Sequence, residues 1–278
     1  MRDLYNRCAR VYVPSSVIGA ELESHGITRL EILPHGVDTE TFSPAHRSDA
    51  WIHALGVGAR QRILWVGRLV PEKDLATLIQ VHGILTRRRS DWVMIVVGDG
   101  PSRKEMEAAM PGAIFTGHRS GQFLSAAYAS SDLFLFPSPT ETFGNVVLEA
   151  MASGSVPVCV REGGAQSSVR DGVTGLIANP RDPADIARCV EMLLDSAGRR
   201  SLMRAAALAY ARGETWEQVF DRQFKSYGEV VALSSRSPSG GGPGSRTRTG
   251  PRGSSRPRTP RWVGTPRRVT RGRSRTWQ

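Results

Sequence analysis

The amino-acid sequence predicts an α/β fold in which helices cover both faces of a parallel sheet. Over residues 1–233, short apolar runs of strand length alternate with segments of helical periodicity. Uninterrupted apolar runs are typical of strands buried on both faces, whereas a strand with one solvated face alternates apolar and polar residues. The alternation of strands with helices favours parallel pairing of the strands.

Glycines follow many of the apolar runs and support the same fold: Gly67, Gly98, Gly100, Gly117, Gly144, Gly163 and Gly164. In a parallel sheet these positions meet at the edge where the strands end, which is the edge where ligands bind. They therefore predict one cleft of nucleotide size, although glycine after a strand is also ordinary turn chemistry.

The predicted strands, in chain order, are the apolar runs at 11–13, 30–33, 63–66, 92–97, 113–115, 133–136 and 156–160. The predicted helices have apolar residues three or four positions apart and cover 15–24, 74–86, 102–109, 121–129, 143–152, 182–194, 201–211 and 214–231. Ser15 and Asp74 are the expected caps of two of them, because their side chains can accept hydrogen bonds from free backbone N–H groups. In the last helix, Trp216, Phe220, Phe224 and Tyr227 form an expected packing stripe.

The positive charge of the chain is confined to its C-terminal tail. Residues 234–278 contain twelve arginines and no lysine or acidic residue, so removing them from the total of +11 leaves −1 for residues 1–233. Their Gly, Pro, Ser, Thr and Arg composition cannot bury a core and predicts disorder. An arginine-rich arm can bind RNA, DNA or acidic membranes. A tail without a selected function, as an out-of-frame reading of a GC-rich gene would give, is the favoured interpretation, and nucleic-acid binding is disfavoured.

The cysteines and hydropathy indicate a cytoplasmic protein. Cys8, Cys159 and Cys189 are an odd number with no metal-ligand spacing, which fits a reducing compartment without structural disulfides. No apolar run approaches membrane-spanning length and the start lacks a signal-peptide pattern. Peripheral attachment to the inner membrane surface stays open.

Residues 137–151 carry the most informative motif, Pro-Ser-Pro-Thr-Glu-Thr-Phe-Gly-Asn-Val-Val-Leu-Glu-Ala-Met. An apolar strand precedes it, and a helix predicted to start near Phe143 would direct free N–H groups and the positive end of its dipole at the ligand edge. That is an anion site. Glu141 and Glu149 flank it, and because carboxylates repel phosphate, we expect them to accept hydrogen bonds from sugar hydroxyls. The motif indicates recognition of a phosphorylated sugar or a nucleotide.

A second motif, Gly-Arg-Leu-Val-Pro-Glu-Lys-Asp at 67–74, follows a predicted strand and opens a helix. Arg68 and Lys73 can both lean over the strand end, where a planar guanidinium and a compact ammonium suit a diphosphate. Two solvated surface charges would be the better interpretation of this motif alone. Together with the glutamate motif, the diphosphate interpretation is favoured.

These motifs, with Gly98–Pro101 and Phe115–Gly117 between them, resemble in their order the donor-binding half of retaining GT-B glycosyltransferases of family four. The resemblance covers roughly residues 1–230 and is strongest to bacterial GDP-mannose-dependent alpha-mannosyltransferases. Residues 34–44 resemble the interdomain segment of that family, with His35 where Asn is usual, and Ser167 stands where an acidic residue is common. The implied fold is the Rossmann-like C-terminal domain of a GT-B enzyme.

The resemblance also implies roles. Arg68 and Lys73 would hold the donor diphosphate and stabilise the leaving nucleotide, and Glu141 would bind the donor sugar; these three are the expected catalytic residues. Donor binding would use backbone N–H groups of Phe143, Gly144 and Asn145, the ribose contact of Glu149, and the segment around His118 near the base. The donor would be a nucleotide-diphosphate sugar, GDP-mannose above all, and neither a metal nor another cofactor is expected. Retention of configuration would follow from front-face attack assisted by the leaving phosphate, which is favoured over a double displacement.

Other interpretations of the same residues stay open. Two carboxylates could be a glycosidase pair, which the basic pair and the anion site disfavour. Glu149 could pair with a lysine or arginine, and His118 could equally be a surface turn residue. His35 is expected to be a hinge-turn residue rather than a catalytic base.

The resemblance implies four parts. Residues 1–45 would be the end of an N-terminal acceptor domain with the interdomain segment, 46–212 the donor-binding domain, 213–233 a crossing helix and 234–278 the tail. Because Met1–Ala9 resembles the last helix and strand of the first domain, we expect a truncated gene product that lacks the rest of that domain. The acceptor would be a lipid or a glycan, and completion by a separate N-terminal polypeptide stays open. The alternative functions are a non-catalytic nucleotide-sugar-binding remnant and, more weakly, RNA binding by the tail.

Overall fold

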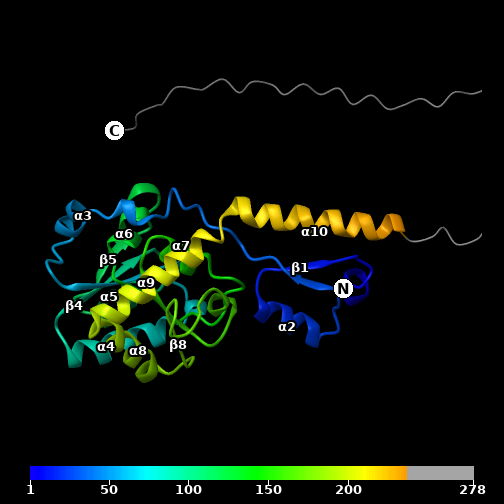
Figure 1. Ribbon diagram of the computed structural model, residues 1–278. Helices are drawn as coiled ribbons and strands as arrows, with labels where there is room; N and C mark the ends of the chain where they lie inside the picture. The colour runs from blue at the N-terminus through cyan, green and yellow to red at the C-terminus, as the bar shows by residue number, and fades with distance from the viewer. Residues whose placement is uncertain (237–278) are drawn as a thin grey trace, which may run out of the picture. The chain divides into compact units, whose positions relative to one another are not determined.

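The computed structural model describes residues 1–236, with side chains to residue 233; the predicted disorder of 234–278 therefore lies almost wholly outside the described residues. A six-stranded sheet lies between two sets of helices, in the order β5-β4-β3-β6-β7-β8, and all of its neighbouring strands pair in parallel (Figure 1). The strands are β3 (Gln61–Val66), β4 (Trp92–Val97), β5 (Ile114–Gly117), β6 (Leu133–Phe136), β7 (Val156–Val160) and β8 (Leu176–Ala178). The predicted parallel α/β sheet is confirmed.

The central strands are apolar on both faces because each face supports its own core. In β3, Ile63 and Trp65 point into one buried cluster, while Leu64 and Val66 point into the other. Each fully buried aliphatic side chain contributes about 1.5–3 kcal/mol, so the two clusters stabilise the sheet from both sides. Burial on both faces explains why these strands are uninterrupted apolar runs in the sequence.

Two sets of helices supply those cores. One core is formed with α4 (Leu75–Arg88), α5 (Arg103–Ala109) and α8 (Pro183–Leu194). The other is formed with α3 (Asp49–Ala54), α6 (Gly121–Ser130), α7 (Asn145–Ala152) and α9 (Ala197–Arg212). Helix α9 also reaches the first core through Met203.

Several boundaries differ from the prediction. The three-residue strand β8 and the six-residue helix α3 were not predicted, because so short a segment shows no clear period. Helix α9 starts four residues earlier than predicted, where the Ser196 side chain accepts a hydrogen bond from the Arg199 N–H. The cap predicted at Ser15 is confirmed, since its hydroxyl accepts from the N–H of Ile18.

The N-terminal segment forms a small substructure of its own. Helix α1 (Arg2–Tyr5) precedes β1 (Val11–Val13), and β1 pairs in parallel with β2 (Leu30–Ile32) through the crossover helix α2 (Ser16–Ser24). The last helix, α10 (Trp216–Arg236), lies beside β1, where the rings of Tyr12 and Tyr227 meet at 5.7 Å. Residues 1–236 all belong to one compact unit, and the predicted divisions at 45 and 212 stay predictions.

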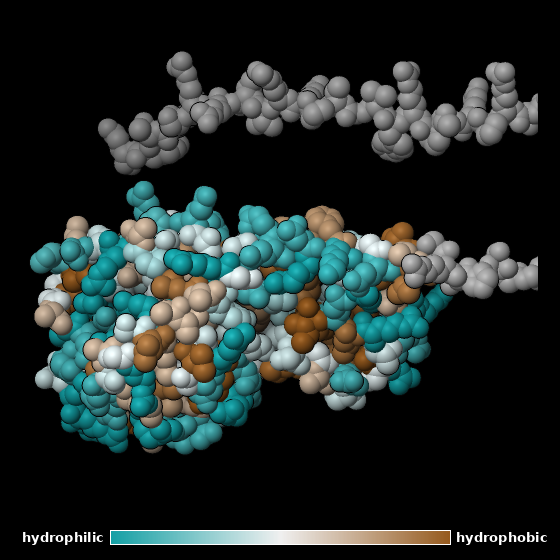
Figure 2. Space-filling model, in the orientation of Figure 1, coloured by the Kyte–Doolittle hydropathy of each residue, from teal (hydrophilic) through white to brown (hydrophobic). Residues whose placement is uncertain are grey.

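The aromatic stripe predicted on the last helix is present, but much of it is exposed. Trp216 stacks on His35 and Phe220, and Tyr227 contacts Tyr12, yet Phe224 is 67% exposed. Figure 2 shows apolar surface on this side of the molecule, next to α10. Within the described chain the stripe is only partly covered: Trp216 and Tyr227 each contact an aromatic ring outside α10. None of the described helices has the length and apolar character needed to cross a membrane.

Candidate functional site

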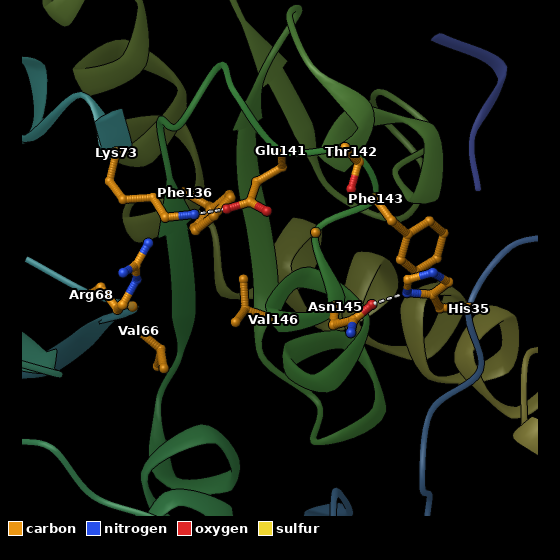
Figure 3. A pocket seen from close by; sticks show the side chains of 12 residues that line it. His35, Val66, Arg68, Lys73, Phe136, Glu141, Thr142, Phe143, Asn145 and Val146 are labelled. Atoms are coloured by element: carbon orange, nitrogen blue, oxygen red, sulfur yellow. Dashed lines mark hydrogen bonds and ion pairs between the residues drawn. The ribbon is translucent and has the colours of Figure 1, made fainter. Parts of the chain in front are cut away.

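A pocket of about 250 Å³ opens at the edge where β3 and β6 end. It brings together six of the eight predicted site residues: Arg68, Lys73, Glu141, Phe143, Gly144 and Asn145. Figure 3 shows the basic side chains at one end of the pocket and His35 with Asn145 at the other. The sheet edge predicted from the glycine positions is therefore the edge that carries this pocket.

The loop that carries Arg68 is fixed against the neighbouring loop after β4. A Cβ added at Gly98 would lie 1.8 Å from the carbonyl oxygen of Gly67, so only glycine permits this approach. The buried Leu69 donates its N–H to the Asp99 carbonyl at 2.9 Å and accepts from the Ser102 N–H at 3.1 Å. With its neighbours held on both sides, Arg68 points into the pocket, and within residues 1–236 its guanidinium takes part in no ion pair. It is available to bind an anion.

Lys73 forms an ion pair with Glu141 across the pocket (Figure 3). Both side chains are about one-fifth exposed, and the Thr140 hydroxyl ties their two loops together by donating to the Glu72 carbonyl at 2.8 Å. The pair places a cation and a carboxylate side by side in the pocket. This arrangement can bind a phosphate group and a neighbouring hydroxyl group at the same time.

Asp74 does not cap α4, which corrects the prediction. It occupies the N-cap position, but its backbone is left-handed with φ 53° and its side chain accepts no hydrogen bond from the helix. The left-handed turn directs the carboxylate away from the first helical N–H groups, and its Oδ2 is buried without a partner in the described structure.

Helix α7, whose start is the predicted anion site, begins two residues later than predicted. Gly144 is the N-cap with φ 83°, so Asn145 rather than Phe143 begins the helix, and Phe143 is a buried residue of the pocket wall. The first helical N–H groups have no acceptor within the helix and carry the positive end of its dipole. Since Asn145 and Val146 line the pocket, this helix start faces its interior.

A second close approach, at Gly164, fixes the loop that carries Glu141 and Thr142, here called the glutamate loop. A Cβ at Gly164 would lie 1.8 Å from the Thr142 carbonyl oxygen, and the Gly164 N–H donates to the Glu141 carbonyl at 2.5 Å. From the other side, the buried Ser15 hydroxyl donates to the Thr142 carbonyl at 2.8 Å. The N-terminal segment thus takes part in positioning this loop, a role that nothing in the local sequence around Ser15 indicated.

His35 is a pocket residue that was not predicted as one. Its Nδ1 lies 2.8 Å from Asn145 Oδ1, and its ring contacts those of Phe143 and Trp216 at 4.9 and 6.0 Å. With Nδ1 as donor, the hydrogen bond orients the Asn145 amide so that its NH₂ group faces away from His35. The only sequence feature that singled out His35 was the resemblance of residues 34–44 to an interdomain segment. That resemblance predicted a turn at His35 but no contact with the ligand.

Glu149 does not line the pocket but lies one turn further along α7. It follows Asn145 by four and Val146 by three positions, which puts it on the same face of the helix. Its Oε2 accepts a hydrogen bond from the Tyr128 hydroxyl at 2.9 Å. Burial raises the pKa of the Glu149 carboxyl, and the Tyr128 hydrogen bond opposes that rise. The described residues offer it no lysine or arginine partner, and the ribose contact stays a prediction.

His118 is exposed in the turn after β5 and does not line the pocket. It lies close enough to Asp99 to contribute to the lowered pKa of that carboxyl, which comes mainly from the Gly100 N–H and the Arg103 side chain. A role near the base stays a prediction. Among residues 1–236, no group of three or more His, Cys, Asp and Glu side chains could hold a metal ion.

Comparison with known proteins agrees with the geometry. The family profile "Glycosyl transferases group 1" matches residues 60–196. The GDP-mannose-dependent alpha-mannosyltransferase of Corynebacterium glutamicum is 37% identical over 243 residues, which cover 86% of this chain and 57% of the relative. The sulfoquinovosyl transferase SQD2 of Arabidopsis thaliana is 35% identical over 226 residues, covering 78% of this chain and 44% of the relative. The chain spans about half the length of the curated relatives it matches.

A solved structure shares the fold. Anabaena Alr3699/HepE, solved in complex with UDP, superimposes with a TM-score of 0.73 at 20% identity, over 82% of this chain and 66% of that one. At this identity the likeness shows the fold alone. It bears out the expected Rossmann-like architecture of a GT-B protein.

Proposed function

Because the chain carries a glycosyl transferases group 1 domain at residues 60–196, we propose that it takes part in hexosyl transfer from a nucleotide-diphosphate sugar. The transferred sugar is mannose, the donor is GDP-mannose and the anomeric configuration is retained. Support for the sugar comes from relatives in Corynebacterium glutamicum and Mycolicibacterium smegmatis, both named GDP-mannose-dependent alpha-mannosyltransferases.

The observation that carries the proposal is the pairing of a free cation with a helix start in one pocket. Arg68 and the first N–H groups of α7 both face the pocket and neither has a negatively charged partner in the described residues. A diphosphate supplies the missing charge and can be contacted from both sides, by the guanidinium and by the backbone. Lys73 adds a second cation at the same end.

These groups stabilise charge where the reaction creates it. The acceptor hydroxyl forms a bond to the anomeric carbon while the bond from that carbon to the diphosphate breaks. Negative charge develops on the leaving nucleoside diphosphate, where Arg68, Lys73 and the α7 N–H groups are already in place. The proton of the acceptor hydroxyl passes to the leaving phosphate on the same face of the sugar, which retains the configuration. Glu141 accepts hydrogen bonds from the donor-sugar hydroxyls.

The acceptor side is part of the proposal. The acceptor is a lipid or a glycan. A nucleotide-sugar donor and three unpaired cysteines favour the cytoplasm, or its membrane surface where the acceptor is a lipid. No metal ion is required for the transfer, because the cationic side chains perform its electrostatic task.

Calorimetric titration of the full chain with GDP, UDP, ADP, GDP-mannose and UDP-glucose, in the presence of EDTA, tests the donor site. We expect GDP and GDP-mannose to bind most tightly and Arg68→Ala to weaken both at least tenfold. Arg87→Ala, an exposed arginine on α4 outside the pocket, is the charge-matched control and should leave binding unchanged.

Two results would count against the proposal. A folded chain that binds none of the nucleotides has no preformed donor site. Binding that Arg68→Ala and Arg87→Ala weaken equally would reflect net charge rather than the pocket. Transfer itself is tested with radiolabelled GDP-mannose and membrane lipid extract as acceptor.

A further inference from the structure

We infer that Tyr128 is a positioning residue for the nucleoside half of the site, because its hydroxyl fixes the carboxylate of Glu149 that faces the ribose. The inference rests on the proposed function and on the predicted contact between Glu149 and the donor ribose. It adds a residue from a different helix, α6, with no contact of its own to the ligand. The observation behind it is the hydrogen bond of 2.9 Å from Tyr128 Oη to Glu149 Oε2.

The packing of its ring holds the Tyr128 hydroxyl in position. The side chain is completely buried in the core of one sheet face. Its ring meets the edge of Phe42 at 5.6 Å and lies tilted against Phe134, also at 5.6 Å. A buried tyrosine needs a partner for its O–H, and in the described structure that partner is Glu149. The hydroxyl is therefore a rigid donor supplied by the core.

A rigid donor restricts the otherwise flexible Glu149 side chain to one orientation. A glutamate has three side-chain torsions, and holding it in one rotamer carries an entropic cost. A hydrogen bond to a charged acceptor is stronger than one between neutral groups and shorter on average. With Oε2 held by Tyr128, the direction of Oε1 is set as well, and that oxygen remains for an external donor. The same bond helps to keep the half-buried group ionised against the effect of burial.

The geometry of α7 directs this carboxylate toward a bound nucleoside. The pocket contains Asn145 and Val146 at the helix start, and Glu149 follows on the same face about one turn, roughly 5 Å, along the axis. A diphosphate held at the helix start therefore places the next group of the ligand beside Glu149. In a nucleoside diphosphate that group is the ribose, whose hydroxyls donate to a carboxylate.

This arrangement predicts selectivity for ribose over 2′-deoxyribose that depends on Tyr128. Calorimetry of the full chain with GDP and 2′-deoxy-GDP measures that selectivity as a ratio of two dissociation constants. We expect the wild type to prefer GDP roughly tenfold, the size of one good hydrogen bond to a charged group. Tyr128→Phe keeps the ring and removes only the hydroxyl, and should reduce the ratio about threefold or more.

Matched variants separate positioning from general weakening. Tyr210→Phe removes the hydroxyl of another largely buried tyrosine, on α9 and outside the pocket, and should leave the ratio unchanged. Glu149→Ala should abolish the preference, and adding Tyr128→Phe to it should have no further effect. If Glu149→Ala instead leaves part of the preference and the double mutant loses that part, Tyr128 acts independently of Glu149 and the positioning role is overturned. Melting curves of all variants keep loss of fold distinct from loss of selectivity.

Failure of the inference and failure of the proposed function give different results. If Glu149→Ala abolishes the preference for GDP and Tyr128→Phe retains it in full, Tyr128 has no positioning role while the donor site stands. If the wild type binds both nucleotides equally, Glu149 does not bind the ribose 2′-hydroxyl, and the inference falls with that assignment. If the folded wild type binds neither, the donor site itself is wrong.

Discussion

The ion pair between Lys73 and Glu141 joins two residues with opposite roles toward a diphosphate. The cation attracts the phosphates and the carboxylate repels them, while the carboxylate can bind sugar hydroxyls. Glu141→Ala should therefore tighten binding of GDP about threefold, because it leaves Lys73 unpaired beside Arg68. The same variant should weaken GDP-mannose, so the order of affinities for the two ligands changes. Lys73→Ala should weaken both.

Calorimetry with the two ligands checks these opposite signs. Glu105→Ala, on the exposed surface of α5, is the control for removal of one negative charge. If Glu141→Ala and Glu105→Ala tighten GDP equally, the effect comes from net charge and not from the pair.

Glu149 is a residue at which stability and binding are expected to conflict. Burial raises the pKa of its carboxyl in the folded state, so the ionised form destabilises the fold above the unfolded-state pKa. This destabilisation disappears as the pH falls through the raised pKa and the group becomes protonated. Glu149→Gln should therefore raise the melting temperature at pH 7 and raise it less near pH 4. An equal gain at both pH values would show that charge burial is not the cause.

At the scale of the elements, the glutamate loop depends on a glycine behind it. A Cβ at Gly164 would lie 1.8 Å from the Thr142 carbonyl oxygen, and since that atom is backbone, the loop itself must shift. We expect Gly164→Ala to lower the free energy of unfolding by about 1–3 kcal/mol, as other overpacked sites do, and to weaken donor binding because Glu141 moves with the loop. Denaturant unfolding and calorimetry measure the two effects.

Gly198→Ala is the control for this element. Gly198 lies in the first turn of α9, and an added Cβ would meet no atom within 4 Å, so alanine should stabilise the helix by roughly 0.5–1 kcal/mol. If both alanines stabilise, the close approach behind the glutamate loop has no energetic consequence.

The central strands and most of the pocket were predictable because their signals are local. The runs at 92–97, 133–136 and 156–160 match β4, β6 and β7 residue for residue, since burial on both faces leaves a continuous apolar record. Arg68 and Glu141 follow strand ends, and parallel strands all end at one edge. Topology alone therefore brings such residues together.

The contacts that were missed join positions far apart in the sequence. Tyr128 is 21 residues from Glu149, His35 is 110 from Asn145 and Ser15 is 127 from Thr142. No periodicity connects such pairs, because they arise from the packing of helices and loops after the sheet has formed. The prediction that Asp74 caps α4 was wrong for another reason. Its residue type suits a cap, but its left-handed backbone at the tight turn after Lys73 directs the carboxylate away from the helix N–H groups.

For the whole molecule, two of the three cysteines report on the two cores separately. Cys8 is exposed, whereas Cys159 on β7 and Cys189 on α8 are buried in the cores on opposite faces of the sheet. Burial raises the pKa of the Cys159 thiol to about 12 and also raises that of Cys189, so neither is a thiolate at pH 8 in the folded state. We expect one thiol to react rapidly with Ellman's reagent in the native chain and all three after denaturation.

The rates at which the two buried thiols react with Ellman's reagent show whether the two cores open together. Because one sheet separates them and its strands contribute to both, loss of either core removes the support of the other, and we expect both thiols to react at one common rate set by global unfolding. Cys8→Ser removes the fast phase, so the remaining kinetics belong to the buried pair. Two distinct slow rates would show that one face of the sheet opens without the other, and the face that opens first is identified by Cys159→Ser.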